Sequence, residues 1–227
     1  EKFMKHPIQW GRRASGQIFL RSKYRFKSVV QAMEVAETYV KEARNTQSLP
    51  YYFIRTQTDL KTKSGHKLGL GSSAAITIGT IQTILQLFGI DHDPDLLFKL
   101  GAITHLSLGA SGSFGDLAAS AYGGLIQYTN FNRDAIVNKL PRAIINELLN
   151  SDWNSLDIQQ LPIPSNWKLL VGWTGSPSST HKQIKKAPAK DLASESYQIQ
   201  MNNIQELVTV ASSALYSNDF ETFSASL

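Results

Sequence analysis

The sequence predicts a fold that mixes helices with strands, because segments of both periodicities occur along the chain. Apolar residues recur every three or four positions over residues 26–43 and 194–217, which is typical of amphipathic helices. Aromatic and β-branched residues dominate residues 51–60 and 168–174, which favours strands. Two glycine- and serine-rich stretches lie between these elements, and they are the main candidates for a functional site.

Composition is that of an ordinary soluble domain or pair of domains. The chain has 227 residues, of which 42% are hydrophobic and 18% charged. No apolar run reaches the ~18 residues of a membrane span and no leader-type segment opens the sequence, so we expect a cytoplasmic protein without a membrane partner. The absence of cysteine excludes disulfides, thiolate catalysis and cysteine-based metal sites.

The net charge of +5 would suit a partner that carries several negative charges. Much of the positive charge lies early in the chain, where a solvated strand edge and loop also explain it. Nucleic acid stays open as a partner, although no aromatic motif of the RNA-binding type accompanies the basic residues. These early basic residues are Arg12, Arg13, Arg21, Lys23, Arg25 and Lys27.

The first third of the chain predicts strand, helix and strand. Residues 1–22 are consistent with one or two strands broken at Gly11 and Gly16. An amphipathic helix over residues 26–43 follows, and then a strand over residues 51–60.

A glycine-rich loop then runs into an apolar helix that continues to Phe88. Glycines let backbone N–H groups converge on an anion, and the first N–H groups of a helix have no intrahelical partner. Lys67 adds a mobile positive charge just upstream, and the serine hydroxyls could cap the helix, bind a phosphate oxygen or ligate Mg²⁺. The alternative is a tight turn with a serine N-cap. The loop consists of Gly69, Leu70, Gly71, Ser72, Ser73 and Ala74.

This loop does not match two better-known phosphate loops. No lysine follows the glycines as G-x-x-x-x-G-K-[ST] requires, and Ala74 occupies the last position of G-x-G-x-x-G.

Residues 91–95 place three carboxylates around a histidine, but they also fit an ordinary helix start. Asp93 would be the N-cap and Pro94 the first helical residue. We expect the helix to continue to Leu108, with His105 as a packed or surface histidine rather than a ligand.

The second glycine-rich stretch, residues 109–115, leads to a carboxylate. Asp116 opens a helix of small residues that ends at paired glycines, and a strand over residues 125–128 follows. Asp116 could simply complement the helix dipole, but flexible loops of this kind more often position ligands. Its candidate ligand-binding residues are Ser111, Gly112 and Ser113.

The last part of the chain predicts a helix near residues 142–150, a strand over 168–174 and a long helix over 194–217. The stripe of apolar residues on that long helix favours a core helix, and another helix begins at Asp219. A hydroxyl-rich turn follows the strand, but no G-x-S-x-G supports a hydrolase triad. The candidate residues of this turn are Ser178, Ser179, His181 and Lys182.

Three motifs together resemble the GHMP small-molecule kinases. They are Gly-Leu-Gly-Ser-Ser-Ala-Ala at residues 69–75, Gly-Ser-Phe-Gly-Asp at 112–116, and Gly-Trp-Thr-Gly-Ser-Pro-Ser-Ser-Thr at 172–180. The second and third look most like the phosphomevalonate kinase branch. The resemblance is clear from residue 51 to about residue 182.

The resemblance implies an α+β, two-domain kinase. Residues 1–150 would form a ribosomal-protein-like ATP-binding domain and residues 165–227 part of a ferredoxin-like domain. The reaction would transfer a phosphoryl group from ATP to 5-phosphomevalonate, with Mg²⁺ bound preferentially by Ser73. Asp116, expected to be buried, would contact the acceptor together with the catalytic Lys67. The residues that would bind the substrate are Ser111, Gly112, Ser113, Ser178, Ser179, His181 and Lys182.

The family also carries an N-terminal Pro-Gly-Lys-like strand and a C-terminal glycine-rich motif, and neither occurs in these 227 residues. We therefore interpret the sequence as a piece of a longer enzyme. Two alternatives stay open. One is another GHMP enzyme, of the mevalonate kinase, diphosphomevalonate decarboxylase or homoserine kinase type. The other is a nucleic-acid-binding module of the same fold.

Overall fold

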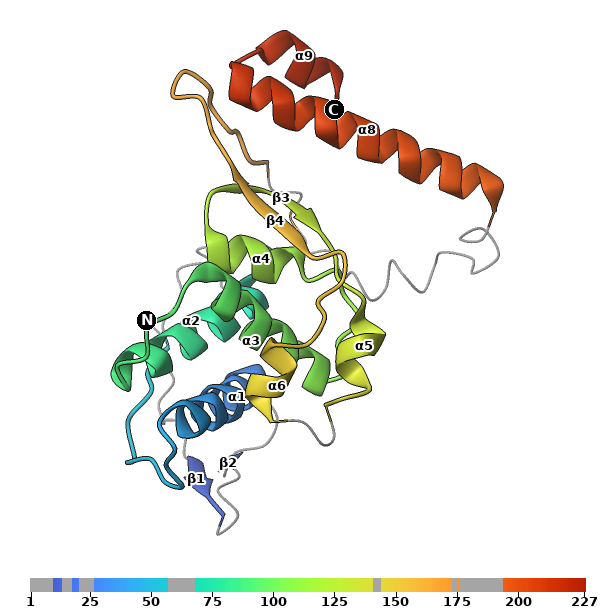
Figure 1. Cartoon of the computed structure of the whole chain (residues 1–227). Helices are drawn as coiled ribbons and strands as arrows, with labels where there is room; N and C mark the ends of the chain where they lie inside the picture. Colours follow the sequence, from blue (N-terminus) through green and yellow to red (C-terminus); the bar gives the residue numbers. More distant parts are fainter. Residues whose placement is uncertain are drawn as a thin grey trace.

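The computed structural model describes residues 10–13, 18–20, 27–56, 68–140, 144–172, 175 and 194–227. Helices form most of this part of the chain and two short antiparallel strand pairs complete it (Figure 1). Strand β1 (Trp10–Arg12) pairs with β2 (Ile18–Leu20), with Gly11 opposite Phe19. The predicted strand break at Gly11 is therefore wrong, because this glycine lies in the middle of β1.

Three helices form the centre of the molecule. They are α1 (Lys27–Ala43), α2 (Ser72–Leu87) and α3 (Pro94–Ser107), which pack pairwise against one another. All three were predicted: α1 from its apolar spacing, α2 from the glycine-rich loop that leads into an apolar segment, and α3 from its N-cap and proline. Asp93 is the N-cap of α3 and its carboxylate accepts a hydrogen bond from the backbone N–H of Leu96 at 2.8 Å, so the helix-start interpretation of this acidic segment is confirmed.

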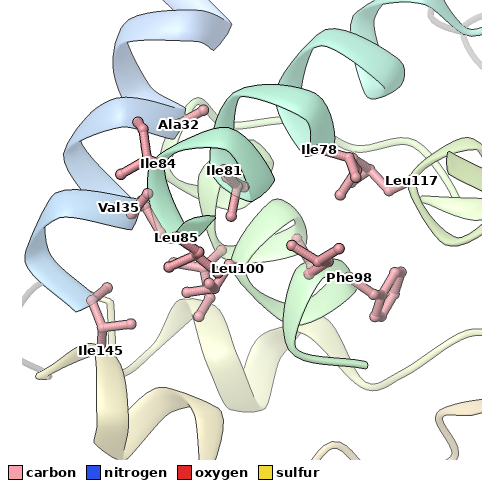
Figure 2. Close-up of a cluster of buried hydrophobic side chains, with 14 of the residues drawn as sticks. Ala32, Val35, Ile78, Ile81, Ile84, Leu85, Phe98, Leu100, Leu117 and Ile145 are labelled. Carbon is pink, nitrogen blue, oxygen red and sulfur yellow. The ribbon is translucent and has the colours of Figure 1, made fainter. Parts of the chain in front are cut away.

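The hydrophobic core lies where these helices meet α4 (Gly115–Tyr122). Figure 2 shows its side chains between the helices, with Ile78 of α2 beside Leu117 of α4. Gly101 of α3 permits this approach, because a Cβ on it would lie 2.7 Å from Ile78 Cδ1 and 3.3 Å from Leu117 Cδ2. The three helices α2, α3 and α4 are thus closely packed at one point.

A second strand pair extends from this core. Strand β3 (Leu125–Thr129) pairs antiparallel with β4 (Asp157–Leu161), and α5 (Arg133–Val137) and α6 (Ile145–Leu149) lie between them in sequence. The predicted strand at residues 125–128 is confirmed. Strand β4 was missed because its sequence, Asp-Ile-Gln-Gln-Leu, is mostly polar and its position is fixed by pairing with β3.

Helix α8 (Glu195–Ser217) lies beside β4, and α9 (Phe220–Ala225) packs against α8 (Figure 1). The Ser212 hydroxyl of α8 donates a hydrogen bond to the side-chain oxygen of Gln127 at 2.7 Å. Both helices were predicted, but the core role of α8 is wrong for most of its length. Its buried residues are confined to its C-terminal part, and most of the predicted apolar stripe is exposed. The predicted division into domains 1–150 and 165–227 stays a prediction.

Two predicted strands are wrong within the described residues. Residues 51–56 and 168–172 pair with no strand in the part of the chain that the structure describes. Leu170 is 89% exposed, and the Tyr51 ring lies instead 4.8 Å from the Arg12 guanidinium. Strand-favouring composition is insufficient when no partner strand is adjacent, because a strand is stabilised by its ladder.

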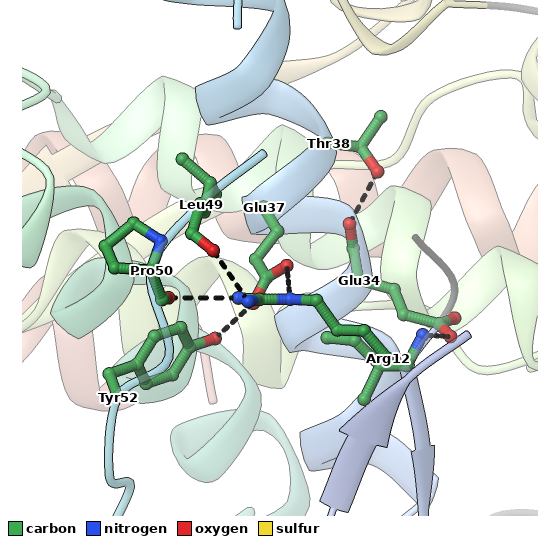
Figure 3. A network of polar contacts seen from close by, with 8 residues as sticks. Arg12, Glu34, Glu37, Thr38, Leu49, Pro50 and Tyr52 are labelled. Atoms are coloured by element: carbon green, nitrogen blue, oxygen red, sulfur yellow. Dashed lines mark hydrogen bonds and ion pairs between the residues drawn. The ribbon is translucent and has the colours of Figure 1, made fainter. Parts of the chain in front are cut away.

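A buried ion pair joins the N-terminal strands to this core (Figure 3). Glu37 of α1 is only 1% exposed, and its carboxylate accepts hydrogen bonds from the Arg12 guanidinium at 2.7 and 3.1 Å and from the Tyr52 hydroxyl at 2.9 Å. The same guanidinium donates to the carbonyl of Leu49 at 2.7 Å. Arg12 therefore connects β1, α1 and the segment after α1.

We predict that Glu37→Gln lowers the free energy of unfolding by about 3 kcal/mol, because it leaves the part-buried Arg12 guanidinium without its counter-charge. The matched control is Asp95→Asn, which removes a partly exposed pair with Lys99 and should cost only about 0.5 kcal/mol. Urea unfolding of both variants measures this. Equal losses would contradict the importance of the buried pair.

Candidate active site

The first predicted loop lies at the N-terminus of α2. Gly71 is its N-cap residue, with a φ of 66° in the left-handed region that favours glycine, and no side chain caps the helix. The alternative of a serine N-cap is therefore wrong: Ser72 and Ser73 are the first two helical residues. Ser73 is exposed, and its hydroxyl lies next to backbone N–H groups at the positive end of the helix dipole.

The second predicted loop lies at the N-terminus of α4, and a strained residue sets its direction. Phe114 is the N-cap with a φ of 62°, an unusual conformation for a side chain of this size. Its ring is 2% exposed and stacks on Phe131 at 5.9 Å between centroids. The packing of this ring compensates the strained backbone and fixes the start of the helix that carries Asp116.

Two side chains donate hydrogen bonds to backbone carbonyl groups of the second loop. The Arg133 guanidinium donates a hydrogen bond to the Ser111 carbonyl at 2.9 Å and lies 5.0 Å from the centroid of the Phe114 ring. The Tyr128 hydroxyl donates to the Ser113 carbonyl at 2.8 Å. Burial is the main cause that raises the pKa of Tyr128 to about 12, so this hydroxyl keeps its proton at neutral pH.

This anchoring leaves the predicted ligand-binding groups of the loop accessible. Ser111 and Ser113 are exposed. Gly112 has no positive φ, and a Cβ on it would meet no described atom within 4 Å, so the fold itself does not demand a glycine there. A small residue without a packing role is consistent with close approach of a ligand to the backbone.

The two loops meet at Gly71 and Asp116. A Cβ on Gly71 would lie 3.5 Å from the Cβ of Asp116, although the two residues are far apart in sequence. The N-termini of two helices and one carboxylate are therefore brought to the same place. An anion bound at the N-terminus of α2 would therefore lie near Asp116.

Asp116 itself is exposed, so the expectation of a buried carboxylate is wrong. One of its oxygens accepts a hydrogen bond from the backbone N–H of Leu117 at 3.0 Å. The physical reason is its place in the first turn of α4, on the side away from the core residues Leu117 and Ala118. The carboxylate is available to a ligand from solvent.

Sequence reasoning missed two residues at this site. Arg133 is a cation at the second loop, where only Lys67 and Lys182 had been considered, and no sequence pattern connects it to that loop. His105 was expected to be packed or on the surface, and it is half-buried between α2 and α4. Its Nε2 lies 3.2 Å from the Thr77 hydroxyl and its ring contacts Phe114. Helical spacing could have placed His105 near the end of α3, but not these contacts.

Several predicted site residues lie outside the described residues, namely Lys67, Ser178, Ser179, His181 and Lys182. Within the described ranges no group of three or more histidine, aspartate or glutamate side chains could hold a metal ion. Among the helices that the structure describes, none has the length and apolar character needed to cross a membrane.

The fold and the two helix N-termini agree with the comparison to known sequence families. Residues 29–124 match the profile described as "GHMP kinases N terminal domain". Over this segment the chain is similar to the N-terminal domain of the GHMP kinases.

Among individual relatives, the chain is 31% identical over 192 residues to the phosphomevalonate kinase of Streptomyces sp. strain CL190, which covers 84% of this chain and 50% of the relative. It is also 31% identical to the mevalonate kinase of Thermococcus sibiricus, over 118 residues, which is 52% of this chain and 28% of that enzyme. The chain thus spans half or less of the length of these curated relatives.

Solved structures show the same fold. The crystal structure of a Lin0012 protein from Listeria innocua matches with a TM-score of 0.81 at 29% identity, over 97% of this chain and 60% of that one. Streptococcus pneumoniae phosphomevalonate kinase in complex with phosphomevalonate and AMPPNP matches with a TM-score of 0.74 at 23% identity, over 92% of this chain and 61% of that one. The prediction of an α+β GHMP kinase fold is confirmed.

We predict opposite effects for two glycine substitutions in or next to α2. Gly71→Ala should lower the free energy of unfolding by about 1–2 kcal/mol, because alanine is strained at a φ of 66°. Gly79→Ala is the matched control: it lies within the helix with no described atom within 4 Å of its Cβ, and should raise stability by about 0.5–1 kcal/mol. Thermal or urea unfolding measures both. A stabilising Gly71→Ala would contradict the left-handed conformation of the loop.

Proposed function

We propose that this chain is part of a phosphomevalonate kinase, which transfers the γ-phosphoryl group of ATP to 5-phosphomevalonate and releases ADP and 5-diphosphomevalonate. The observation that carries the proposal is the meeting of the α2 loop with Asp116, marked by the 3.5 Å between a Cβ on Gly71 and the Cβ of Asp116. Phosphoryl transfer needs two bound phosphates, charge neutralisation and in-line orientation, and little covalent help from the protein.

In this proposal the α2 loop binds the phosphates of ATP. Residues 69–74 offer backbone N–H groups at the positive end of α2, and the left-handed Gly71 turns the chain so that it can approach a phosphate closely. The half-buried Ser72 and the exposed Ser73 add hydroxyl donors beside them. An anion here is stabilised without any buried positive side chain.

The α4 loop binds the acceptor in this proposal. The accessible Ser111 and Ser113 would donate hydrogen bonds to its phosphate or carboxylate, and Gly112 would let it approach the backbone. The Arg133 guanidinium, which holds this loop, adds positive charge nearby. Lys67, Ser178, Ser179, His181 and Lys182 remain proposed contributors from outside the described residues.

Asp116 orients the acceptor. A phosphate acceptor is largely ionised at neutral pH because its second pKa is near 6, so no strong base is needed to remove a proton. A carboxylate beside two phosphates costs Coulomb energy, which the two helix N-termini, the nearby cations and a metal ion offset. Its exposure to solvent reduces this cost further.

The described residues fit a Mg²⁺ ion of the kind that accompanies ATP. Mg²⁺ prefers oxygen ligands and commonly binds one or two protein groups together with substrate phosphates and water. The Ser73 hydroxyl, two residues after Gly71, and the Asp116 carboxylate of the other loop could supply such oxygen ligands. Bound there, the ion would neutralise charge on the phosphates.

The extent of the sequence match favours phosphomevalonate over mevalonate as the acceptor. The match to the Streptomyces phosphomevalonate kinase extends over 192 residues, whereas the match to the Thermococcus mevalonate kinase ends after 118. The longer match includes part of the chain beyond the nucleotide loop, where acceptor specificity is expected to lie. The reaction would place the protein in the mevalonate pathway of isoprenoid synthesis.

A coupled assay of ADP release tests the proposal on the protein that carries this chain. With Mg²⁺-ATP we expect turnover with 5-phosphomevalonate and none with mevalonate, 5-diphosphomevalonate or homoserine. Turnover with mevalonate alone would move the assignment to another GHMP kinase. Silence with all four acceptors in a folded protein, together with salt-dependent RNA binding, would favour the nucleic-acid-binding alternative.

We predict different kinetic effects for the two loops. Asp116→Asn should lower kcat about 10- to 100-fold with little change in KM for ATP, because the variant side chain no longer orients the acceptor. Ser73→Ala should raise the Mg²⁺ concentration needed for half-maximal rate. The control is Asp134→Asn, an exposed first-turn aspartate of α5, which should leave kcat unchanged. Wild-type kinetics in both site variants would remove these assignments.

A further inference from the structure

A chain of hydrogen bonds runs beneath the first turn of α2. The Thr77 hydroxyl donates to the Ser73 carbonyl at 3.0 Å, and the Nε2 of His105 lies 3.2 Å from the same hydroxyl. Thr77 is completely buried. A hydroxyl has a single proton, so once it is donated to Ser73 the hydroxyl can only accept from His105. In this arrangement the hydrogen of the imidazole is assigned to Nε2.

The surroundings of His105 agree with a neutral ring that carries this hydrogen. Burial lowers the pKa of His105, and the negative charge of nearby Asp116 opposes that shift. A neutral imidazole has one N–H, and placing it on Nε2 completes the chain from α3 to the backbone of the phosphate loop.

The same imidazole contacts the other loop. Its ring meets the Phe114 ring edge to face, with 6.0 Å between centroids and 79° between planes. Phe114 is the left-handed N-cap of α4, two residues before Asp116. One side chain of α3 thus touches the structural support of both loops, by a polar contact on one side and a ring contact on the other.

We propose that His105 is a positioning residue that fixes the α2 loop and the α4 loop relative to each other. This inference rests on the proposed function, in which the two loops hold the two reacting phosphates. His105 reaches Ser73 through Thr77 and Asp116 through Phe114, and it contacts neither substrate. Because a displacement of about 1 Å between reacting groups can cost about 100-fold in rate, a small loss of register would reduce kcat.

Kinetics of variants that remove one contact at a time test the polar link. Thr77→Val and His105→Phe both break the hydrogen-bond chain, and His105→Phe keeps an aromatic ring against Phe114. We expect each to lower kcat about 10-fold with KM for ATP changed less than about threefold. Because both remove the same link, the double variant should be no slower than either single one. Thr77→Ser and His105→Gln, which keep the hydroxyl and an N–H donor respectively, should recover most of the polar effect.

Thr104→Val is the matched control. The Thr104 hydroxyl is equally buried and makes the same kind of bond, to the Leu100 carbonyl at 2.8 Å, one residue before His105 in α3. This variant should lose as much stability as Thr77→Val and keep its kcat. Equal loss of kcat in both, or additive effects in the double variant, would show that the rate follows general stability and would overturn the proposal.

Hydrogen exchange separates this inference from the proposed function, because it needs no turnover. Amide exchange is compared between the unmodified protein, Thr77→Val and Thr104→Val without ligands. We expect Thr77→Val to speed exchange both in the first turn of α2 and at residues 115–118 of α4. Faster exchange at α2 alone would overturn the coupling, even in an active enzyme. Faster exchange at both loops in a protein inactive toward 5-phosphomevalonate would retain the coupling and remove only the proposed reaction.

Discussion

The close packing of α2, α3 and α4 at Gly101 is the constraint on which the site depends. A side chain at this position would collide with Ile78 of α2, so the absence of one sets the distance between these helices. Ile78 lies in the second turn of α2 and Leu117 in the first turn of α4. The two loops lie only a few residues before Ile78 and Leu117 in the sequence. Rigid helices therefore transmit the spacing of the core to the two N-termini, where Gly71 meets Asp116.

The glycine-rich loops are exposed to solvent, but the packed core behind them fixes their position. Ser111 and Ser113 are exposed, and their carbonyls accept hydrogen bonds from Arg133 and Tyr128 respectively. The strained Phe114 is held by buried rings. These hydrogen bonds and ring contacts keep the loop ordered and leave its solvent-facing side free for a ligand. Binding loops on rigid scaffolds are generally built in this way.

The sequence predicted the helices well and the strands poorly, and the reason is physical. Caps and apolar spacing are local signals, so α1, α3 and α9 could be located from residues such as Asp93 and Asp219. Strands depend on partners elsewhere in the chain, so residues 51–56 look like a strand and are not, whereas the polar β4 is one. The two loops were found from their motifs, but Arg133 and His105 were not, because only the fold brings them there.

The exposure of Asp116 bears on which acceptor the site suits. A carboxylate that must remove a proton from a hydroxyl benefits from burial, since burial increases its proton affinity. Asp116 lies instead exposed at the N-terminus of a helix. Such a group is better suited to orient an acceptor that is already ionised than to activate an alcohol. For the proposed function, the exposure of the carboxylate and the extent of the sequence match are separate arguments for a phosphate acceptor.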